Sequence, residues 1–367
     1  MLGYKIVIRT SDTASYAEDL TNCNGQNAAI LARAYCDVPI ASLRSSAVYN
    51  LPWGASVWAK VTAYNKYGNS EESPEGNGAR ILTIPDAPVS LTETVSQRSA
   101  TSITFTWLAG AKNGGDPVLD YRVNTDNSNG VWIVLKSNLQ ALTFTATNLI
   151  AGNTYIFQVE ARNSYGYSAL SQGVSILCAT IPSRPAPPTS VVVANNVIIS
   201  WKKPSENGTP ITAYTILIKQ ADGGFSEALT NCNGAVAAIR DAMECTVPLS
   251  VLYATPYNLI LGQTIESKII ATNNYGSSDV SEVGGTALIV LVPSEPLSLD
   301  NNPAVTMGPN IGITWTPSAQ VGGSAILDYQ VLYDAGRGDS VFDILQSGVP
   351  TAYYTATGLT LGTTYAF

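Results

Sequence analysis

The sequence predicts an all-β protein in which several β-sandwiches follow one another along the chain. Three observations predict this fold class: apolar and polar residues alternate in short runs, similar runs recur about every hundred residues, and proline clusters separate the recurring units. In YIFQVEAR, for example, Tyr155, Phe157 and Val159 fall on one side of an extended chain. A strand that buries one face has this period of two. The intervening turns are rich in Gly, Pro, Asn and Asp, which is typical of all-β sandwiches.

Each unit repeats the same features in the same order. A tryptophan lies in an alternating run, a bend follows, a tyrosine lies in the next run, and the motif A-x-N-x-Y-G comes near the end. Because the order and spacing recur, each unit is expected to be one copy of the same sandwich. The recurring positions are Trp107, Trp201 and Trp315; Tyr4, Tyr121, Tyr214 and Tyr329; and Gly68, Gly166 and Gly276.

Proline clusters mark where one unit ends and the next begins. IPDAP, IPSRPAPP and VPSEP each interrupt the alternating pattern, and proline cannot donate a hydrogen bond to a sheet. The predicted domains are therefore residues 1–84, 85–182, 183–293 and 294–367. Short linkers that contain proline are stiff, so we expect the domains to be arranged end to end. The first unit has no tryptophan run and the last stops inside a strand, so we expect both to be truncated parts of a longer array.

These motifs resemble the fibronectin type III domain, and the resemblance covers nearly the whole chain. The tryptophan of the second strand, the tyrosine of the third, L-x-x-G-x-x-Y and A-x-N-x-x-G-x-S appear in the expected order. The resemblance implies a seven-stranded, two-sheet, immunoglobulin-like sandwich in tandem copies. It also implies an extracellular or cell-surface protein. The cysteine loops and the two-domain period resemble, more loosely, long secreted protist arrays.

Cysteine pairs occur in the first and third units. Cys23 and Cys36, and Cys232 and Cys245, each lie 13 residues apart and begin in the motif TNCNG, whereas the even units carry the corner tyrosine of the family. We predict that both pairs are disulfides, which implies an oxidising compartment. Buried thiols or a metal site are the alternatives, although the sequence has neither C-x-x-C nor histidine. Cys178 is expected to be a buried side chain, with an intermolecular disulfide as the alternative.

The composition argues against catalysis and against nucleic-acid binding. The 367 residues include no histidine, the commonest general base and metal ligand. The sequence has no nucleophile elbow, phosphate loop or metal-spaced cluster, so we expect no enzyme activity, no cofactor and no metal. The formal net charge of −8 disfavours binding to nucleic-acid phosphates. No apolar run has transmembrane length, so we expect no membrane insertion within these residues.

Two short motifs are candidate sites. GRGDS contains Arg337, Gly338 and Asp339, which spell the adhesion motif Arg-Gly-Asp. It lies where the second unit has the polar turn NTDNSNG, and adhesive members of the family carry the motif one hairpin later. We therefore expect a hairpin turn rather than a receptor site. NGT at Asn207 is the only glycosylation sequon, and it is predicted to lie in a surface loop.

The sequence favours a non-enzymatic structural protein, a segment of a long extracellular rod or fibril. The expected partners are other copies of the same protein, in a filament or surface layer, and attached glycans. Trp58 and Ile156 are predicted to face outward, where they would favour packing against another copy. The alternatives are a cell-adhesion or receptor ectodomain that binds a partner or glycan, and the accessory repeats of a secreted enzyme.

Overall fold

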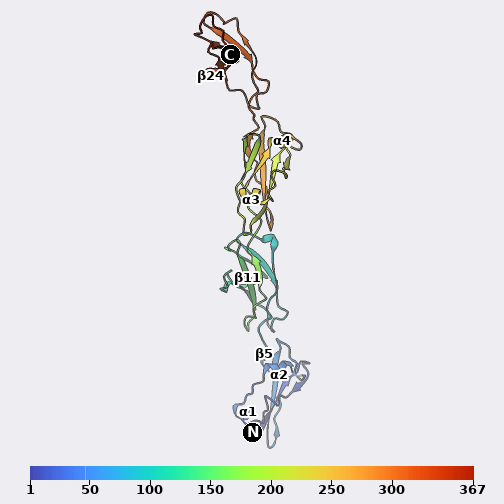
Figure 1. Ribbon diagram of the computed structural model, residues 1–367. Helices are drawn as coiled ribbons and strands as arrows, with labels where there is room; N and C mark the ends of the chain where they lie inside the picture. Colours follow the sequence, from blue (N-terminus) through green and yellow to red (C-terminus); the bar gives the residue numbers. More distant parts are fainter. Residues whose placement is uncertain (46) are drawn as a thin grey trace. The chain divides into compact units, whose positions relative to one another are not determined.

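The architecture, taken from a computed structural model, is described for residues 1–45 and 47–367. The chain divides into two compact units, Met1–Thr180 and Ile181–Phe367. Antiparallel strands form nearly all of both, and Figure 1 shows helices in the segments coloured blue (α1, α2) and yellow (α3, α4). Each unit contains two of the predicted domains, numbered here first to fourth in chain order. Within the described residues, every helix is too short or too polar to span a membrane.

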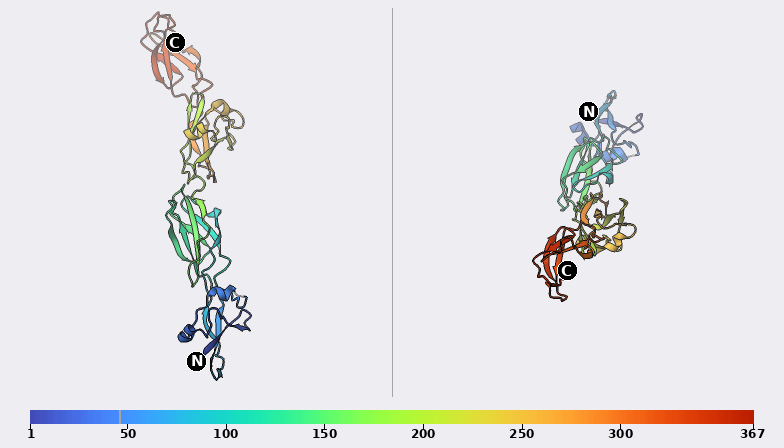
Figure 2. Two further views of the ribbon diagram at one scale, coloured as in Figure 1. Left: turned by 60° about the horizontal axis from the view of Figure 1, so that its bottom comes forward. Right: turned by 90° about the horizontal axis from the view of Figure 1, so that it is seen from above.

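The first domain contains a five-stranded sheet with two short helices. The strand order is β2-β1-β3-β4, and β5 also pairs with β3. Figure 2 shows the blue helices beside these strands from two further directions. Helix α1 begins after Asn27, whose side-chain oxygen accepts a hydrogen bond from the Ala29 amide at 2.9 Å. The elements are β1 (Gly3–Arg9), β2 (Tyr16–Ala17), α1 (Ala28–Arg33), α2 (Ile40–Ser45), β3 (Ser56–Asn65), β4 (Gly68–Asn69) and β5 (Gly76–Arg80).

The second domain is a sandwich of a three-stranded sheet, β10-β7-β6, and a four-stranded sheet, β12-β11-β8-β9. Phe105 of β7 stacks on Phe157 of β11 with ring centroids 4.7 Å apart. Trp107 meets Tyr121 edge-on at 5.6 Å, also between the two sheets. The elements are β6 (Val89–Glu93), the 3-10 helix η1 (Val95–Gln97), β7 (Ile103–Leu108), β8 (Asp120–Thr125), β9 (Ile133–Leu139), β10 (Thr143–Ala146), β11 (Thr154–Arg162) and β12 (Val174–Leu177).

The third domain packs β13-β14-β17 against a five-stranded sheet, β16-β15-β18-β19, in which β20 also pairs with β18. Trp201 and Tyr214 meet edge-on with ring centroids 5.3 Å apart. The elements are β13 (Thr189–Val193), β14 (Asn196–Ser200), β15 (Ile211–Lys219), β16 (Phe225–Glu227), α3 (Ala237–Ala242), β17 (Glu244–Pro248), α4 (Leu249–Tyr253), β18 (Thr264–Asn273), β19 (Gly276–Ser277) and β20 (Gly284–Leu288).

The fourth domain has a three-stranded sheet, β21-β22-β25, and a two-stranded sheet, β23-β24, in its described residues. Trp315 and Tyr329 again meet edge-on, at 5.1 Å. The same aromatic pair therefore joins the two sheets of three domains, which explains why the two residues recur together in the sequence. The elements are β21 (Leu297–Asn301), β22 (Ile311–Thr316), β23 (Tyr329–Tyr333), β24 (Asp343–Val349) and β25 (Tyr353–Ala356).

Candidate interaction surfaces

The cysteine loops of the first and third domains have the same construction. Cys23 is bonded to Cys36, and Cys232 to Cys245, with Cα atoms 5.2 and 5.1 Å apart, as disulfide geometry requires. Helices α1 and α3 lie inside the two loops. The glycine of TNCNG packs against the tyrosine strand, because a Cβ at Gly234 would lie 2.2 Å from the Tyr214 carbonyl oxygen. The motif therefore recurs because it fixes the loop to the sheet.

The even domains carry a tyrosine at the corner where the odd domains have Val57 and Ile265. The hydroxyl oxygen of Tyr155 accepts a hydrogen bond from the Ile150 amide at 2.9 Å. The hydroxyl oxygen of Tyr365 accepts a hydrogen bond from the Thr360 amide, also at 2.9 Å. The odd and even domains thus fix their loops by different means, a covalent bond in one and a hydrogen bond in the other.

Cys178 is a fully buried thiol in the second domain. It is 0% exposed, and its Sγ donates to the Ala100 carbonyl at 3.3 Å. Burial raises the pKa of this thiol above its ordinary value, and the negative charge of Glu93 adds to the shift. A buried, protonated thiol is a poor nucleophile, so Cys178 belongs to the core.

The GRGDS loop joins β23 to β24, and its arginine is held by the loop itself. The Arg337 guanidinium pairs with Asp343 at 2.7 Å and donates to the Val341 carbonyl at 2.7 Å. Its Nε also lies 3.5 Å from Asp339. Arg337 and Asp339 are exposed, but each is engaged with neighbours within the turn. A receptor would have to break these contacts before it could bind both charges.

The side chain of Asn207 holds the linker that precedes the third domain. Its amide nitrogen donates to the Ile181 carbonyl at 2.8 Å and to the Ser183 hydroxyl at 3.2 Å. Glycosylation would modify this same nitrogen and would break at least one of the two bonds. The glycosylation of Asn207 stays a prediction, and the geometry does not favour it.

A long apolar strand forms one edge of the four-stranded sheet in the second domain. Val131 and Trp132, directly before β9, and Ile133 and Val134, its first two residues, are each between 40% and 60% exposed. Strand β9 is the last strand of its sheet. An exposed edge with consecutive apolar side chains is a surface onto which another chain can pack.

The fourth domain repeats this edge. Val341 and Phe342, directly before β24, and Ile344, its second residue, are between 42% and 61% exposed. Asp343, which pairs with Arg337, lies between them. In the odd domains the strand at this place is β2 or β16, of only two or three residues, which is a common way to avoid edge pairing. We call residues 131–134 and 341–344 the apolar edges.

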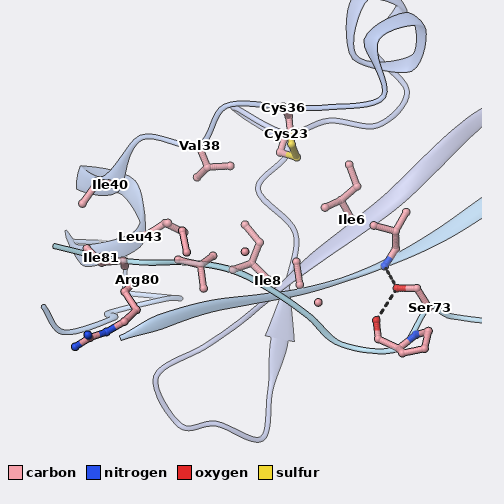
Figure 3. Close-up of a pocket in the computed structure, with 17 residues that line it drawn as sticks. Ile6, Ile8, Cys23, Cys36, Val38, Ile40, Leu43, Ser73, Arg80 and Ile81 are labelled. Atoms are coloured by element: carbon pink, nitrogen blue, oxygen red, sulfur yellow. Dashed lines mark hydrogen bonds between the residues drawn. A yellow bond between two sulfur atoms is a disulfide. The ribbon is translucent and has the colours of Figure 1, made fainter. Parts of the chain in front are cut away.

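The first domain has an apolar groove with a cavity volume of about 640 Å³. Figure 3 shows Ile6 and Ile8 of β1 on one side of this space, and Val38 and Leu43 on the other. In the third domain, β13 and β14 belong to the sheet that covers the corresponding face. Among the described residues of the first domain, no strand pair covers this face, and we assign the groove no ligand.

Within each compact unit, two domains meet through glycines. In Met1–Thr180, a Cβ at Gly115 of the second domain would lie 2.2 Å from the nitrogen of Gly54 in the first. In Ile181–Phe367, a Cβ at Gly323 would lie 2.6 Å from the nitrogen of Gly262. All four residues have positive φ, so glycine is required for both the backbone conformation and the close approach.

Hydrogen bonds reinforce the joint between the first and second domains. The Thr83 amide donates to the Gly114 carbonyl at 2.9 Å. The Arg80 guanidinium donates to the Gly115 carbonyl at 2.7 Å and pairs with Asp116 at 3.2 Å. The Asn163 side chain, from the motif A-x-N-x-Y-G, donates to the Thr83 carbonyl at 2.8 Å. The asparagine of this motif thus holds the linker between the two domains.

Comparison with known proteins identifies the second domain. Residues 86–176 match the fibronectin type III domain. This part of the chain belongs to that family. The relatives of the chain include M-protein, striated muscle, of Gallus gallus, which is 26% identical over 70% of this chain and 17% of its own length. Protein sidekick-1 of Homo sapiens is 24% identical over 92% of this chain and 14% of its own length.

The name of a third relative refers to cell adhesion. "Cell adhesion molecule-related/down-regulated by oncogenes" of Xenopus laevis is 28% identical over 39% of this chain and 12% of its own length. The chain spans less than a fifth of the length of each of these three relatives.

The apolar edges of the second and fourth domains were missed by the sequence analysis. Trp58 and Ile156, predicted to face outward, are both half-buried. The Arg9 guanidinium covers the Trp58 ring at 4.9 Å, and Ile156 lies against Gly173 of the neighbouring segment. The unbroken apolar run VWIV, which departs from alternation directly after a polar turn, was the available signal for the exposed edge.

The described residues hold no group of three or more His, Cys, Asp or Glu side chains that could bind a metal ion.

Proposed function

We propose that the chain is a non-enzymatic, extracellular array of adhesion type that binds partner proteins, foremost other copies of itself. The observation that carries this proposal is the pair of apolar edges on the two even domains. A single exposed apolar side chain is ordinary on a protein surface, whereas consecutive ones on an unpaired edge strand mark an interface. The same edge occurs twice, at matching places of two domains.

The cysteine loops and the relatives support the extracellular and adhesive parts of the proposal. Disulfides persist in oxidising compartments and are rare in the cytosol. A relative is related by name to a cell adhesion molecule, and the three relatives carry no enzyme name. These similarities favour adhesion over the structural rod that the sequence analysis preferred. The rod remains a second candidate, because another relative is M-protein of striated muscle.

Self-association through the apolar edges is tested with the double variant Trp132→Lys/Phe342→Lys. Beads coated with the full chain should aggregate, and sedimentation should show mass increasing with protein concentration. Lysine on both edges introduces charge repulsion and removes apolar contact area, so the double variant should stay monomeric and its beads dispersed. Asp339→Glu should aggregate beads and attach to cells like the parent chain, since Arg-Gly-Asp is not proposed as the binding site.

The control is Leu229→Lys, which makes the same kind of change at a residue that is 57% exposed and lies outside the apolar edges. This variant should aggregate beads normally. The proposal fails if the unmodified chain remains monomeric at high concentration and its beads stay dispersed. Long filaments in electron micrographs without bead aggregation would favour the structural rod instead.

A further inference from the structure

A cleft of about 520 Å³ lies between the first and second domains, inside the compact unit Met1–Thr180. The first domain contributes Arg44 and Trp53, and the second contributes the loop that includes Lys112, Asn113 and Gly114. This volume lies in the range of small-ligand sites. The cleft combines an aromatic ring, two cationic groups and a glycine-rich backbone.

Arg44 has a donor that the protein leaves unused. Its guanidinium carbon lies 3.8 Å from the centroid of the Trp53 ring. Its Nε is buried and has no hydrogen-bond partner among the described residues. A buried N–H without a partner is unfavourable. Because Nε is shielded from solvent, a ligand in the cleft would accept hydrogen bonds from the terminal nitrogens of this guanidinium.

The third and fourth domains provide an internal comparison for this cleft. One offset relates Gly54 to Gly262 and Gly115 to Gly323, and it places Leu261 at Trp53 and Gln320 at Lys112. Leu252 corresponds to Leu43, because the Leu259 amide donates to the Leu252 carbonyl as the Leu51 amide does to that of Leu43. The next residue, Tyr253, therefore takes the place of Arg44.

The counterpart residues carry no charge. Tyr253 is 39% exposed, and Leu261 packs against the core of the third domain. A joint between two such domains therefore needs neither the arginine, the tryptophan nor the lysine. These three residues give the first joint a chemistry that its packing does not require.

The walls of the cleft are fixed, and no acidic side chain lines it among the described residues. Gly54 and Gly115 meet backbone to backbone, so the two sides have little freedom to move. Asp116, beside the cleft, is paired with Arg80. Asp86 accepts a hydrogen bond from the Lys112 amide at 3.0 Å. Arg44 and Lys112 therefore supply the net positive charge of the cleft.

We propose that this cleft binds a small acidic ligand that carries a carboxylate or a sulfate. The planar guanidinium of Arg44 can donate to an oxyanion, and its stacking on Trp53 fixes its orientation. The Trp53 ring packs against the core of the first domain and is covered by Arg44, so its role is to position the guanidinium. Lys112, at the exposed rim, adds a second positive charge without blocking entry. This assignment is independent of the apolar edges and of self-association.

Calorimetric titration of the full chain tests the proposal with three disaccharides: one that contains glucuronate, one that is sulfated, and a neutral one. At least one acidic disaccharide should bind at millimolar concentrations or below, and the neutral one should bind at least tenfold more weakly (about 1.4 kcal/mol corresponds to tenfold). The two acidic disaccharides distinguish a carboxylate from a sulfate ligand. Binding should weaken as salt is added.

Arg44→Leu removes the guanidinium, and it should weaken binding about tenfold or more, since a charged hydrogen bond is lost. Lys112→Gln introduces the residue that the fourth domain has at this place. It should weaken binding about two- to fivefold, because Lys112 is exposed to solvent. Lys202→Gln, which removes another exposed lysine far along the sequence, should leave binding unchanged.

The proposal is overturned if neither acidic disaccharide binds or if the neutral one binds equally well. It is also overturned if folded Arg44→Leu keeps full affinity. Should Arg44→Leu fail to fold, the Lys112→Gln variant and the salt series decide: unchanged affinity in both would reject the site.

Discussion

At the residue scale, Asp334 shows how one carboxylate sets the conformation of the GRGDS loop. It accepts hydrogen bonds from the amides of Gly336, Gly338 and Ala366, each at 3.0 Å. These backbone hydrogen bonds hold the pKa of Asp334 below its ordinary value. Asp126 has the same role in the second domain, where it accepts from the Ile156 amide at 2.9 Å. The sequence predicted both turns from their composition, but the bond from each turn to a distant strand depends on tertiary contacts.

Replacement of Asp334 by alanine is therefore expected to loosen the loop. Amide hydrogen exchange in residues 335–343 should be faster in Asp334→Ala than in the parent chain at neutral pH. Since the pKa is lowered in the folded state, the stabilisation is present above the ordinary aspartate pKa and is lost as pH falls through the folded-state value. The ratio of the two exchange rates should thus approach one in acid.

Asp339→Ala is the matched control for this loop, because that exposed carboxylate accepts from a single backbone amide, that of Val341 at 3.1 Å. Its effect on exchange should be smaller. If Asp339→Ala had the larger effect, Asp334 would not be the anchor of the loop.

At the scale of elements, sequence periodicity predicted the strands that bury one face. Strands β7, β11 and β18 alternate because a sheet has two faces and one of them meets the core. The helical turns suspected near residues 28–34 and 235–242 exist as α1 and α3. Helices α2 and α4 were missed, since five or six residues are too few to show a helical period.

The joints and the apolar edges could not be predicted from local pattern. Gly54 and Gly115 lie in different domains, and their contact appears only when the two sandwiches are placed together. The exposure of VWIV depends on β9 being the last strand of its sheet, which is a property of topology and not of the run itself.

The glycine joint predicts that Gly115→Ala separates the first domain from the second. The added Cβ would lie 2.2 Å from the Gly54 nitrogen, so the loops must move apart and the Arg80 contact to the Gly115 carbonyl should be lost. Trypsin cleavage after Arg80 should then be faster than in the parent chain.

Gly130→Ala separates this steric effect from backbone strain. Gly130 also has positive φ, 79°, but nothing lies within 4 Å of an added Cβ. Cleavage after Arg80 should be unchanged in this variant. Equal acceleration in both variants would mean that strain in the second domain, and not the joint, controls access to the linker.

At the scale of the whole molecule, domains with a disulfide-closed loop alternate with domains that have a tyrosine corner. Each disulfide joins cysteines 13 residues apart. In the chain-entropy model, closing such a loop contributes about 3 kcal/mol to the free energy of unfolding. A corner hydrogen bond contributes about 1 kcal/mol net. The stability of the odd domains should therefore depend on the redox state of their surroundings, and that of the even domains should not.

Reduction of the full chain is expected to affect the odd domains selectively. Hydrogen exchange of the most protected amides in residues 1–84 and 183–293 should accelerate by about a hundredfold, the equivalent of about 3 kcal/mol. Residues 85–182 should change little, since their only cysteine, Cys178, is already a thiol. The variant Cys178→Ser should show the same contrast, which excludes a contribution from that residue. Uniform acceleration across all four domains would contradict the alternation of disulfide-closed loops, and no change in the odd domains would show that the cysteine loops stabilise neither domain.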